Sequence, residues 1–369
     1  MTIVLDARTA TDHFPGIGRY VVNLASALMQ IATDLDITLL YDPSASRTRL
    51  ALPDLPHHTC PASPFSLRQQ WSVPQQLRRL RAALYHSPYY LMPYRPGVPA
   101  ILTCYDLIPL VYPQYFNAVN RLIYRFTHAL ALKAASMVVS VSQSTRSDLM
   151  HYFRIDLQRV VVIPLAADAH FKPQPPEALA AAREKYGLPE KYVLYFGSNK
   201  PHKNLPRLVE AFARWHTESR ESQIRLVVAG QWDVRYPEAK QRAEDLNVPV
   251  LFIGSVDDAA LPALYSSATA FVFPSLYEGF GLPPLEAMAC GVPVVCSNAA
   301  SLPEVVGDAA LLVNPRAAEE IAEAITRVLT DAALRDELRA KSLVRASQFS
   351  WERAARATLR VYESVAKNK

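Results

Sequence analysis

Two glutamates, Glu278 and Glu286, stand out in the stretch FPSLYEGFGLPPLEAMACGVPVVCSN, residues 273–298, which otherwise carries no charge. The stretch has the pattern of a buried strand, a tight turn and a buried helix. A carboxylate in such surroundings is costly unless hydrogen bonds or a counter-charge replace the lost water. Because the stretch contains no Lys or Arg, we expect the partners to come from elsewhere in the fold or from a ligand.

The two glutamates occupy different positions in this pattern. Glu278 lies on the turn, and Glu286 lies just inside a helix that Pro283 and Pro284 begin, as proline can in a first helical turn. A carboxylate has two acceptor oxygens and matches a vicinal diol, so a ribose would suit Glu286. Stabilisation by the helix N-terminus, about 0.3–1 kcal/mol, is the alternative for Glu286, but it does not account for Glu278.

A basic turn is the second feature that can carry chemistry. In YFGSNKPHKNLPRLVEAF, residues 195–212, a strand ends at Gly197 and Asn204 opens a helix, with Lys200, His202 and Lys203 between them. Three potentially cationic side chains beside a helix N-terminus suit a phosphate or diphosphate. A solvated basic turn is the simpler alternative.

A glycine pair is the third feature. Gly16 and Gly18, in DHFPGIGRYVVNLASAL, precede a predicted helix, where glycine lets a ligand approach the backbone and the helix N-terminus attracts an anion. The third glycine of the dinucleotide-binding fingerprint is missing, so a purely structural turn is equally consistent.

No metal site is predicted. Asp34 and Asp36 spell the D-x-D pattern of metal-dependent transferases of another fold, but they fall between a helix and a strand, where a surface turn is expected. The four cysteines form no C-x-x-C pair and no zinc spacing, which indicates reduced thiols.

The length and the alternation of short apolar runs with helical patterns predict two parallel α/β domains. A proline-rich linker, residues 164–191, separates two series of strands, which places the domains at residues 1–170 and 171–349. A helix in residues 350–369, with Ser350 as N-cap, is expected to cross back onto the first domain. The predicted strands are Thr2–Asp6, Asp36–Tyr41, Leu84–Ser87, Ala100–Cys104, Met137–Val141 and Val160–Ile163, then Tyr192–Phe196, Arg225–Ala229, Val250–Ile253, Ala270–Pro274, Val292–Cys296 and Ala310–Val313.

Charge is unevenly distributed. Residues 1–165 carry 15 Lys and Arg against 9 Asp and no Glu, so this half is expected to meet something anionic. SLRQQWSVPQQLRRLRAALY, residues 66–85, concentrates arginines beside Trp71. No nucleic-acid motif accompanies it, so a solvated helix face or an anionic lipid surface remain as interpretations. No apolar run approaches the ~20 residues of a membrane span, and the N-terminus is typical of a first strand, which favours a cytoplasmic protein.

Taken together, these stretches resemble the retaining glycosyltransferases of family 4, which have the GT-B fold of two Rossmann-like domains facing each other across a cleft. The E-x₇-E spacing within EGFGLPPLE, with K-N upstream, is highly specific. The stretches that carry the resemblance are GIGRY (16–20), HKNLPRLVEAF (202–212), GSV (254–256), FPSLYEGFGLPPLEAMACGVPVV (273–295) and SLPEVVGDAALLVNP (301–315).

The resemblance implies a role for each matched residue. Glu286 would hold the donor ribose, Glu278 the sugar near the reacting centre, and Lys203 the diphosphate leaving group, with Glu278 and Lys203 as catalytic residues. The other implied donor contacts are the backbone of Gly279, Phe280, Gly281 and Leu282, the turn of Gly254 and Val256 at the base, Gly16 and Gly18 at the phosphates, and Ser198, Lys200 and His202 in the basic turn.

The sequence departs from the family at two places. Ser198 and His202 stand where an Arg is common, which leaves Lys200 as the candidate for a second cation. The family often has His-Asp where this chain has Tyr105 and Asp106. Asp106 stays a catalytic candidate, and either Tyr105 or His86 could take the role of the missing His, although a structural hydrogen bond is an equal alternative for His86.

The resemblance implies transfer of a hexose from a nucleotide sugar, without a metal or other cofactor. GDP-mannose is the favoured donor, because the motifs resemble those of the mannosyltransferases of polysaccharide assembly. The expected acceptor is a glycan or a lipid-linked glycan, met by the loops at residues 88–99 and 109–119, and contact with the inner face of an anionic membrane would suit it. A UDP-sugar transferase, a sugar-nucleotide 2-epimerase and a catalytically silent binding protein are the alternatives.

Overall fold

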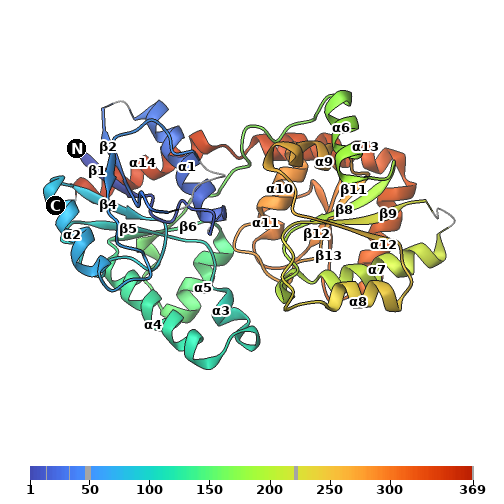
Figure 1. The fold of residues 1–369 in the computed structure, drawn as a ribbon, viewed down its shortest axis with the longest axis horizontal. Helices are drawn as coiled ribbons and strands as arrows, with labels where there is room; N and C mark the ends of the chain where they lie inside the picture. Colours follow the sequence, from blue (N-terminus) through green and yellow to red (C-terminus); the bar gives the residue numbers. More distant parts are fainter. Residues whose placement is uncertain (14, 33, 46–50, 220–222, 368–369) are drawn as a thin grey trace. The chain divides into compact units, whose positions relative to one another are not determined.

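The chain forms two compact units (Figure 1). A computed structural model describes residues 1–13, 15–32, 34–45, 51–219 and 223–367. The first unit comprises Met1–Leu165 and the C-terminal helix α14 (Trp351–Lys367), and the second comprises Ala166–Phe349. The change of unit lies at Leu165, slightly before the boundary after residue 170 that the linker composition indicated.

The first unit is built on a sheet of seven parallel strands in the order β3-β2-β1-β4-β5-β6-β7. Its strands are β1 (Thr2–Asp6), β2 (Asp36–Tyr41), β3 (His57–Thr59), β4 (Leu84–Ser87), β5 (Ala100–Cys104), β6 (Met137–Ser140) and β7 (Val160–Val162). Its helices, besides α14, are α1 (Pro15–Ile31), α2 (Gln69–Arg79), α3 (Ile108–Val111), α4 (Ala118–Ala134) and α5 (Gln143–Phe153), with the 3₁₀ turns η1 (Pro113–Tyr115) and η2 (Leu157–Arg159).

The second unit is built on a sheet of six parallel strands in the order β10-β9-β8-β11-β12-β13. Its strands are β8 (Tyr192–Phe196), β9 (Arg225–Ala229), β10 (Val250–Gly254), β11 (Ala270–Phe273), β12 (Val294–Ser297) and β13 (Ala310–Val313). Its helices are α6 (Pro176–Tyr186), α7 (Leu205–Glu218), α8 (Glu238–Asp245), α9 (Leu261–Ser267), α10 (Leu282–Ala289), α11 (Leu302–Val306), α12 (Ala318–Thr330) and α13 (Ala332–Ser347), with η3 (Pro201–Lys203) and η4 (Asp258–Ala260).

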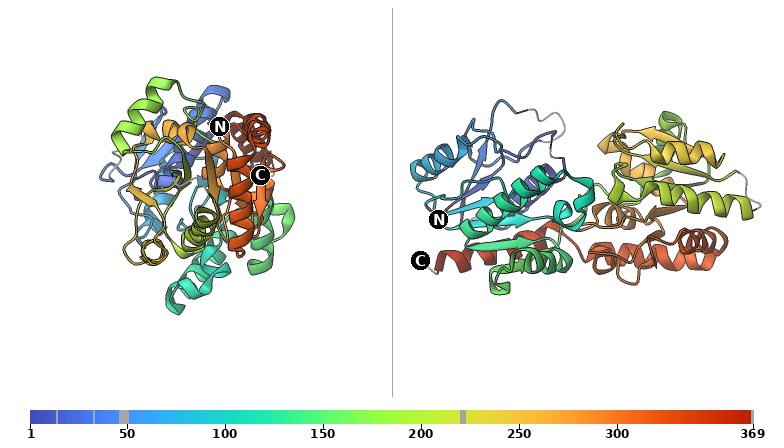
Figure 2. Two further views of the ribbon diagram at one scale, coloured as in Figure 1. Left: turned by 90° about the vertical axis from the view of Figure 1, so that its right-hand side faces the viewer. Right: turned by 90° about the horizontal axis from the view of Figure 1, so that it is seen from below.

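Each sheet is a doubly wound, Rossmann-like sheet with helices on both faces (Figures 1 and 2). Because both faces are covered, the central strands are apolar at consecutive positions: Ile3, Val4 and Leu5 in β1 are fully buried, as are the residues of β11. In both sheets the chain winds outward from the first strand, returns, and continues beside it on the other side. This creates a switch point between β1 and β4 and another between β8 and β11, where ligands of such sheets bind at the carboxyl ends of the strands.

The sequence predicted this architecture correctly, including every strand except the short edge strand β3. In β3 only His57, His58 and Thr59 pair with β2, and their side chains are partly or largely exposed. Such a segment carries no run of apolar residues, so the pattern that predicts buried strands does not include it.

The C-terminal helix α14 packs against α1 of the first unit. The Ser350 hydroxyl accepts a hydrogen bond from the amide of Arg353, 3.1 Å away, and so caps the helix. Further along, the hydroxyl of Tyr362 lies 2.7 Å from Nδ1 of His86 at the end of β4, and Nε2 of His86 lies 2.8 Å from the hydroxyl of Thr103. Burial lowers the pKa of His86 to about 3, so the ring is neutral and one nitrogen donates while the other accepts.

The contact between His86 and Tyr362 gives a first prediction. Tyr362→Phe removes one buried partner and leaves a ring nitrogen of His86 without a hydrogen bond, so the free energy of unfolding should fall by about 1–3 kcal/mol. Urea denaturation at neutral pH measures the change, with Tyr152→Phe, on a half-exposed tyrosine of the same unit, as the matched control. Equal stability of the two variants would contradict the claim that this hydrogen bond holds α14 in place.

Candidate functional site

The two strongest sequence candidates lie on neighbouring turns in the second unit. Because β8 and β11 are adjacent, the turn after β8 and the turn after β11 meet at the same edge of the sheet. Nζ of Lys203 lies 2.7 Å from Oε1 of Glu278, and the two side chains are only 17% and 11% exposed. An ion pair so withdrawn from water is strongly disrupted when either partner is removed.

Glu278 has a second partner in Ser275, whose hydroxyl donates a hydrogen bond to the same Oε1 over 2.6 Å. Lys203, outside residues 273–298, is thus the counter-charge that the sequence led us to expect from elsewhere. Ser275 corrects that expectation, because it lies inside the stretch and still supplies a hydrogen bond.

Glu286 lies on α10, is buried, and has a different environment. The hydroxyl of Tyr265, on α9, donates a hydrogen bond to its Oε2 over 3.1 Å. Lys203 and Ser275 thus contact Glu278, whereas Tyr265 contacts Glu286. Both glutamates follow β11 in the chain, Glu278 on the turn and Glu286 on α10.

The turn between the two glutamates depends on a glycine and a serine. Gly281 has a φ of +116°, and a Cβ at this position would lie 2.7 Å from Cδ2 of Leu302, so only glycine fits. The hydroxyl of Ser301, at the start of α11, lies 2.8 Å from the carbonyl oxygen of Glu278 and 2.6 Å from that of Phe280. A hydroxyl has one proton, so Ser301 donates to one of these carbonyls at a time.

The basic turn contains two cations rather than the three that its sequence suggested. His202 is buried, and this burial together with the positive charge of Lys203 lowers its pKa to about 4, so its ring is neutral near pH 7. Lys200 is exposed and Lys203 is paired with Glu278. Ser198 is half-buried, and its carbonyl accepts a hydrogen bond from Tyr195.

The side chains of two asparagines, Asn204 and Asn199, connect this turn to neighbouring segments. Asn204 occupies the N-cap position of α7, but its side chain makes no capping bond. Its amide donates instead to the carbonyls of Pro274, at 3.0 Å, and Pro315, at 2.6 Å, which ties the turn to β11 and to the loop after β13. Asn199, which sequence analysis missed, bonds to the backbone of Asp233 and Tyr236.

A pocket of about 210 Å³ opens beside the basic turn. Gly254, at the end of β10, lines it, whereas Val256, the other residue that the resemblance implied at the base, is half-buried and packs against the core. Sequence analysis missed Trp232 and Lys240, whose ammonium lies 4.5 Å from the centre of the indole ring. The lining residues are Gly197, Asn199, Leu205, Val228, Gly230, Trp232, Lys240, Phe252, Ile253 and Gly254.

The candidates in the first unit need two corrections. Gly16 and Gly18 do not precede α1 but lie in its first turn, because the helix begins at Pro15. His86 is ruled out as a substitute for the family's histidine, since both of its ring nitrogens are engaged inside the unit. The structural alternative for His86 is therefore the correct one.

Tyr105 and Asp106 lie after β5, at the carboxyl edge of the first sheet. Oδ1 of Asp106 accepts a hydrogen bond from the amide of Ile108 over 3.0 Å, at the start of α3. The Tyr105 hydroxyl is buried and has no hydrogen-bond partner among the residues that the structure describes, and its ring meets that of Tyr20 edge-on at 5.5 Å. Burial raises the pKa of Tyr105, so the phenol stays protonated.

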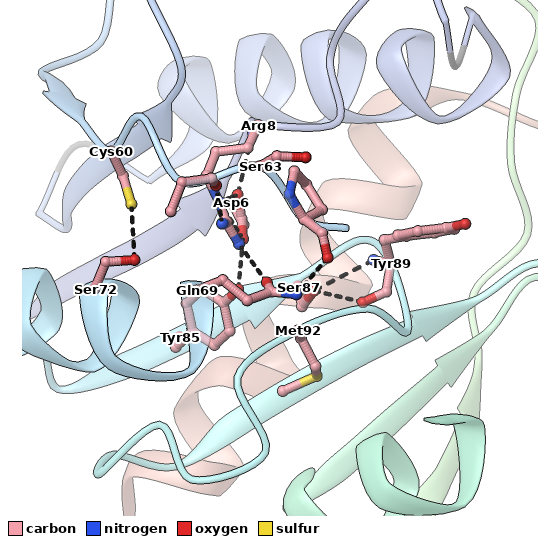
Figure 3. Close-up of polar contacts among 12 residues, drawn as sticks. Asp6, Arg8, Cys60, Ser63, Gln69, Ser72, Tyr85, Ser87, Tyr89 and Met92 are labelled. Atoms are coloured by element: carbon pink, nitrogen blue, oxygen red, sulfur yellow. Dashed lines mark hydrogen bonds and ion pairs between the residues drawn. The ribbon is translucent and has the colours of Figure 1, made fainter. Parts of the chain in front are cut away.

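A buried ion pair near the same edge escaped sequence analysis (Figure 3). The guanidinium of Arg8 contacts the carboxylate of Asp6 at 2.6 Å, the carbonyl of Ala62 at 2.7 Å and Oε1 of Gln69 at 3.2 Å, and Tyr85 donates to the same carboxylate. All these partners belong to the first unit and satisfy one another, so the cluster joins β1, β4 and α2 structurally.

The D-x-D pattern lies where a surface turn was expected. Oδ2 of Asp36, at the amino end of β2, accepts a hydrogen bond from Thr2 and lies at the edge opposite to the carboxyl ends of the strands. Within the described ranges, no three or more His, Cys, Asp and Glu side chains are grouped so that they could hold a metal ion. Among the helices that the structure describes, none has the length and apolar character to cross a membrane.

Comparison with known proteins identifies the class. Residues 15–171 match the family described as Glycosyltransferase Family 4, and residues 179–343 match Glycosyl transferases group 1. The chain belongs to glycosyltransferase family 4, and it is a glycosyltransferase. It is 36% identical, over 80% of its own length and 77% of the relative's, to O-antigen chain mannosyltransferase B of Escherichia coli. It is 31% identical to the serotype-specific mannosyltransferase WbdA of Escherichia coli over 69% of this chain, but spans only 32% of that relative.

Solved structures share the fold. Sucrose-phosphate synthase from Thermosynechococcus elongatus superposes with a TM-score of 0.79 at 24% identity and covers 100% of both chains. HepE from Anabaena, solved with UDP and glucose, has a TM-score of 0.79 at 20% identity, over 99% of this chain and 100% of its own. The fold is therefore GT-B, as the sequence predicted.

Ser301 gives the second prediction. Ser301→Ala leaves the carbonyls of Glu278 and Phe280 without their donor, so the free energy of unfolding should fall by about 1–3 kcal/mol, and glycosyl transfer should slow because the turn that carries Glu278 loosens. Chemical denaturation and initial-rate measurements check both effects. Ser347→Ala, which removes an exposed hydroxyl on α13, is the control. A Ser301→Ala enzyme as stable and as active as this control would show that Ser301 does not position the turn.

Proposed function

We propose that this glycosyltransferase moves a mannosyl residue from GDP-mannose to a glycan or lipid-linked acceptor, with retention at the anomeric carbon and without a metal ion. The relatives support the sugar: they include O-antigen chain mannosyltransferases of Escherichia coli and Salmonella typhimurium. Assembly of a bacterial surface polysaccharide is the corresponding role.

The ion pair between Lys203 and Glu278 is the observation that carries the proposal. Binding a phosphate at Lys203 alone would leave Glu278 buried without its counter-charge, which is costly. A sugar diphosphate removes this difficulty, because its phosphate oxygens accept from Lys203 while its sugar hydroxyls donate to Glu278. The pair is thus suited to a ligand that has an anion and a hydroxyl-rich ring next to each other.

The reaction needs negative charge to be stabilised on the departing diphosphate. Lys203 and the exposed Lys200 lie on the turn that would meet it, and the start of α7 adds the dipole of a helix N-terminus. The resemblance to the retaining enzymes of family 4 supports attack of the acceptor hydroxyl on the same face, with the leaving phosphate taking its proton. In the first unit, we propose Asp106 as a catalytic residue, Tyr105 for the role of the family's missing His, and the first turn of α1 with Gly16 and Gly18 as a phosphate contact.

The pocket beside Gly254 would take the base of the nucleotide. Trp232 and Phe252 provide aromatic surface, and the ammonium of Lys240 lies above both rings, 4.5 and 5.4 Å from their centres. An ammonium is only a hydrogen-bond donor, and guanine offers two adjacent acceptors, O6 and N7, to such a group. This favours GDP. A UDP-sugar donor is the second candidate, since HepE, which shares the fold, was solved with UDP-glucose.

A panel of nucleotides gives the third prediction and tests the donor. GDP and GDP-mannose should raise the melting temperature of the protein more than UDP, ADP or their sugars, because only a bound ligand stabilises the folded state. Slow release of mannose from GDP-mannose without acceptor would separate an enzyme from a silent binding protein. Stabilisation by UDP and not by GDP would overturn the choice of donor.

Two substitutions give the fourth prediction, which separates binding from turnover. Glu286→Ala should weaken donor binding by about 1.5–3 kcal/mol, the range for a hydrogen bond to a charged group. Lys203→Ala should reduce kcat more than donor affinity, because charge on the diphosphate grows as the bond breaks. Titration calorimetry and steady-state kinetics measure the two quantities, with Glu210→Ala, which removes a more exposed acid of the same unit, as control.

The opposite pattern would contradict the assigned roles. A Glu286→Ala variant with unchanged donor affinity would leave only the interaction with the helix N-terminus for Glu286. A Lys203→Ala variant with normal kcat and a raised KM would show that Lys203 binds the ground state and the transition state equally.

For the site of action, we propose the cytoplasm, with peripheral contact at the inner face of an anionic membrane. The arginines Arg78, Arg79 and Arg81 are exposed at the end of α2, while Leu77 is buried in the core of the first unit. Each cation near an anionic lipid surface contributes about 1 kcal/mol. These arginines support an electrostatic contact, and Trp71, 70% exposed, lies on the same helix.

A further inference from the structure

Helix α4 (Ala118–Ala134) carries an apolar stripe that faces away from its own unit. Val119, Leu122, Ile123 and Phe126 occupy positions i, i+3, i+4 and i+7, which form one face of a helix. Their side chains are 67%, 69%, 55% and 62% exposed. Four large apolar side chains in a row on one helix form a contiguous patch, and such patches mark interaction sites.

The stripe is not needed to hold α4 in place, because the opposite face of the helix does so. His128, Ala131 and Leu132 are the buried residues of α4. The ring of His128 stacks on that of Tyr90 at 3.9 Å, and the side chain of Asn117 caps the first turn by accepting from the amide of Asn120 over 2.7 Å. The helix is therefore anchored on one side and leaves the apolar stripe to another partner.

The charges around the stripe indicate what this partner is. Residues 107–147 contain no Asp or Glu, and α4 carries Arg121, Arg125 and Lys133. A second copy of the chain would bring these cations against the same cations, which is unfavourable. An anionic lipid surface complements them, and its acyl boundary accepts apolar side chains.

We infer that the stripe of Val119, Leu122, Ile123 and Phe126 on α4 inserts into the interface of an anionic membrane. A helix of this kind lies in the plane of the interface, with its apolar side chains at the boundary of the acyl chains and its cations at the headgroups. Two kinds of interaction then act together, and the apolar part persists at salt concentrations that screen the charges. The inference does not depend on which nucleotide sugar the second unit binds.

The position of α4 connects this surface with the acceptor loop. Tyr124 of α4 meets the ring of Tyr90, in the loop after β4, at 5.1 Å. The same loop is tied to α2, because the side-chain amide of Gln70 donates to the carbonyl of Met92 over 3.0 Å. A membrane held by α4 would therefore lie next to the segment that we expect to meet a lipid-linked acceptor.

Vesicle co-sedimentation of the full chain tests the inference. Wild-type protein should bind phosphatidylcholine vesicles that contain phosphatidylglycerol better than pure phosphatidylcholine vesicles. The variant Leu122→Gln/Ile123→Gln/Phe126→Gln should keep the helix, because glutamine is a good helix former and the changed face is exposed. Its affinity for the anionic vesicles should be lower than that of wild type by about tenfold or more. Val344→Gln, on an exposed apolar residue of α13, is the matched control and should bind like wild type.

The outcomes distinguish this surface from the arginines of α2. The Arg78→Ala/Arg79→Ala/Arg81→Ala variant should lose binding mainly at low salt, whereas the α4 variant should lose it at low and high salt. Absence of wild-type binding, or equal binding of the α4 variant and wild type, would overturn the inference. If sedimentation velocity showed a dimer of the wild type and a monomer of the α4 variant, the stripe would instead be a contact between two copies of the chain.

Release of mannose from GDP-mannose should be the same in the α4 variant and wild type. A failure of the membrane inference can therefore be told apart from a failure of the proposed donor.

Discussion

The ion pair of Lys203 and Glu278 is the constraint around which the second unit is arranged. Neither charge is tolerated at so low an exposure without the other. The pair can form only because β11 returns beside β8, which brings two turns from distant parts of the sequence to one edge. Ser275, Ser301 and the left-handed Gly281 then fix the turn that carries the glutamate. A ligand at this edge must satisfy both charges at once.

The first unit has the same doubly wound architecture, but different residues lie at the carboxyl edge of its sheet. Its switch point lies between β1 and β4, where Asp6, Arg8 and Tyr85 satisfy one another and His86 is engaged by Tyr362 and Thr103. The polar atoms of these groups bond to one another within the unit. The exposed arginines at the end of α2 and the apolar stripe of α4 are surfaces of this unit that other molecules can reach.

Sequence reasoning predicted the fold nearly completely, because parallel strands covered on both faces are apolar at consecutive positions and are separated by helices. It predicted the site only in part. The sequence identified Glu278, Glu286 and Lys203 as candidates because charged residues are unusual at these motif positions. It did not identify Trp232 and Lys240, because tertiary packing brings them to the pocket and no local pattern encodes that packing. The charge expected of His202 was wrong, and the choice between two roles for His86 stayed open, because a histidine's charge and contacts depend on burial, and burial depends on the complete fold.

We propose that the edge shared by β8 and β11 holds the nucleotide sugar. Hydrogen exchange of the full chain, with and without GDP-mannose, tests it most directly, because exchange reports local opening segment by segment. We expect slower exchange in segments 197–205, 252–257 and 277–287 when the sugar nucleotide is bound. Saturating GDP-mannose that leaves these three segments unchanged, or that protects only other parts of the second unit, would contradict it.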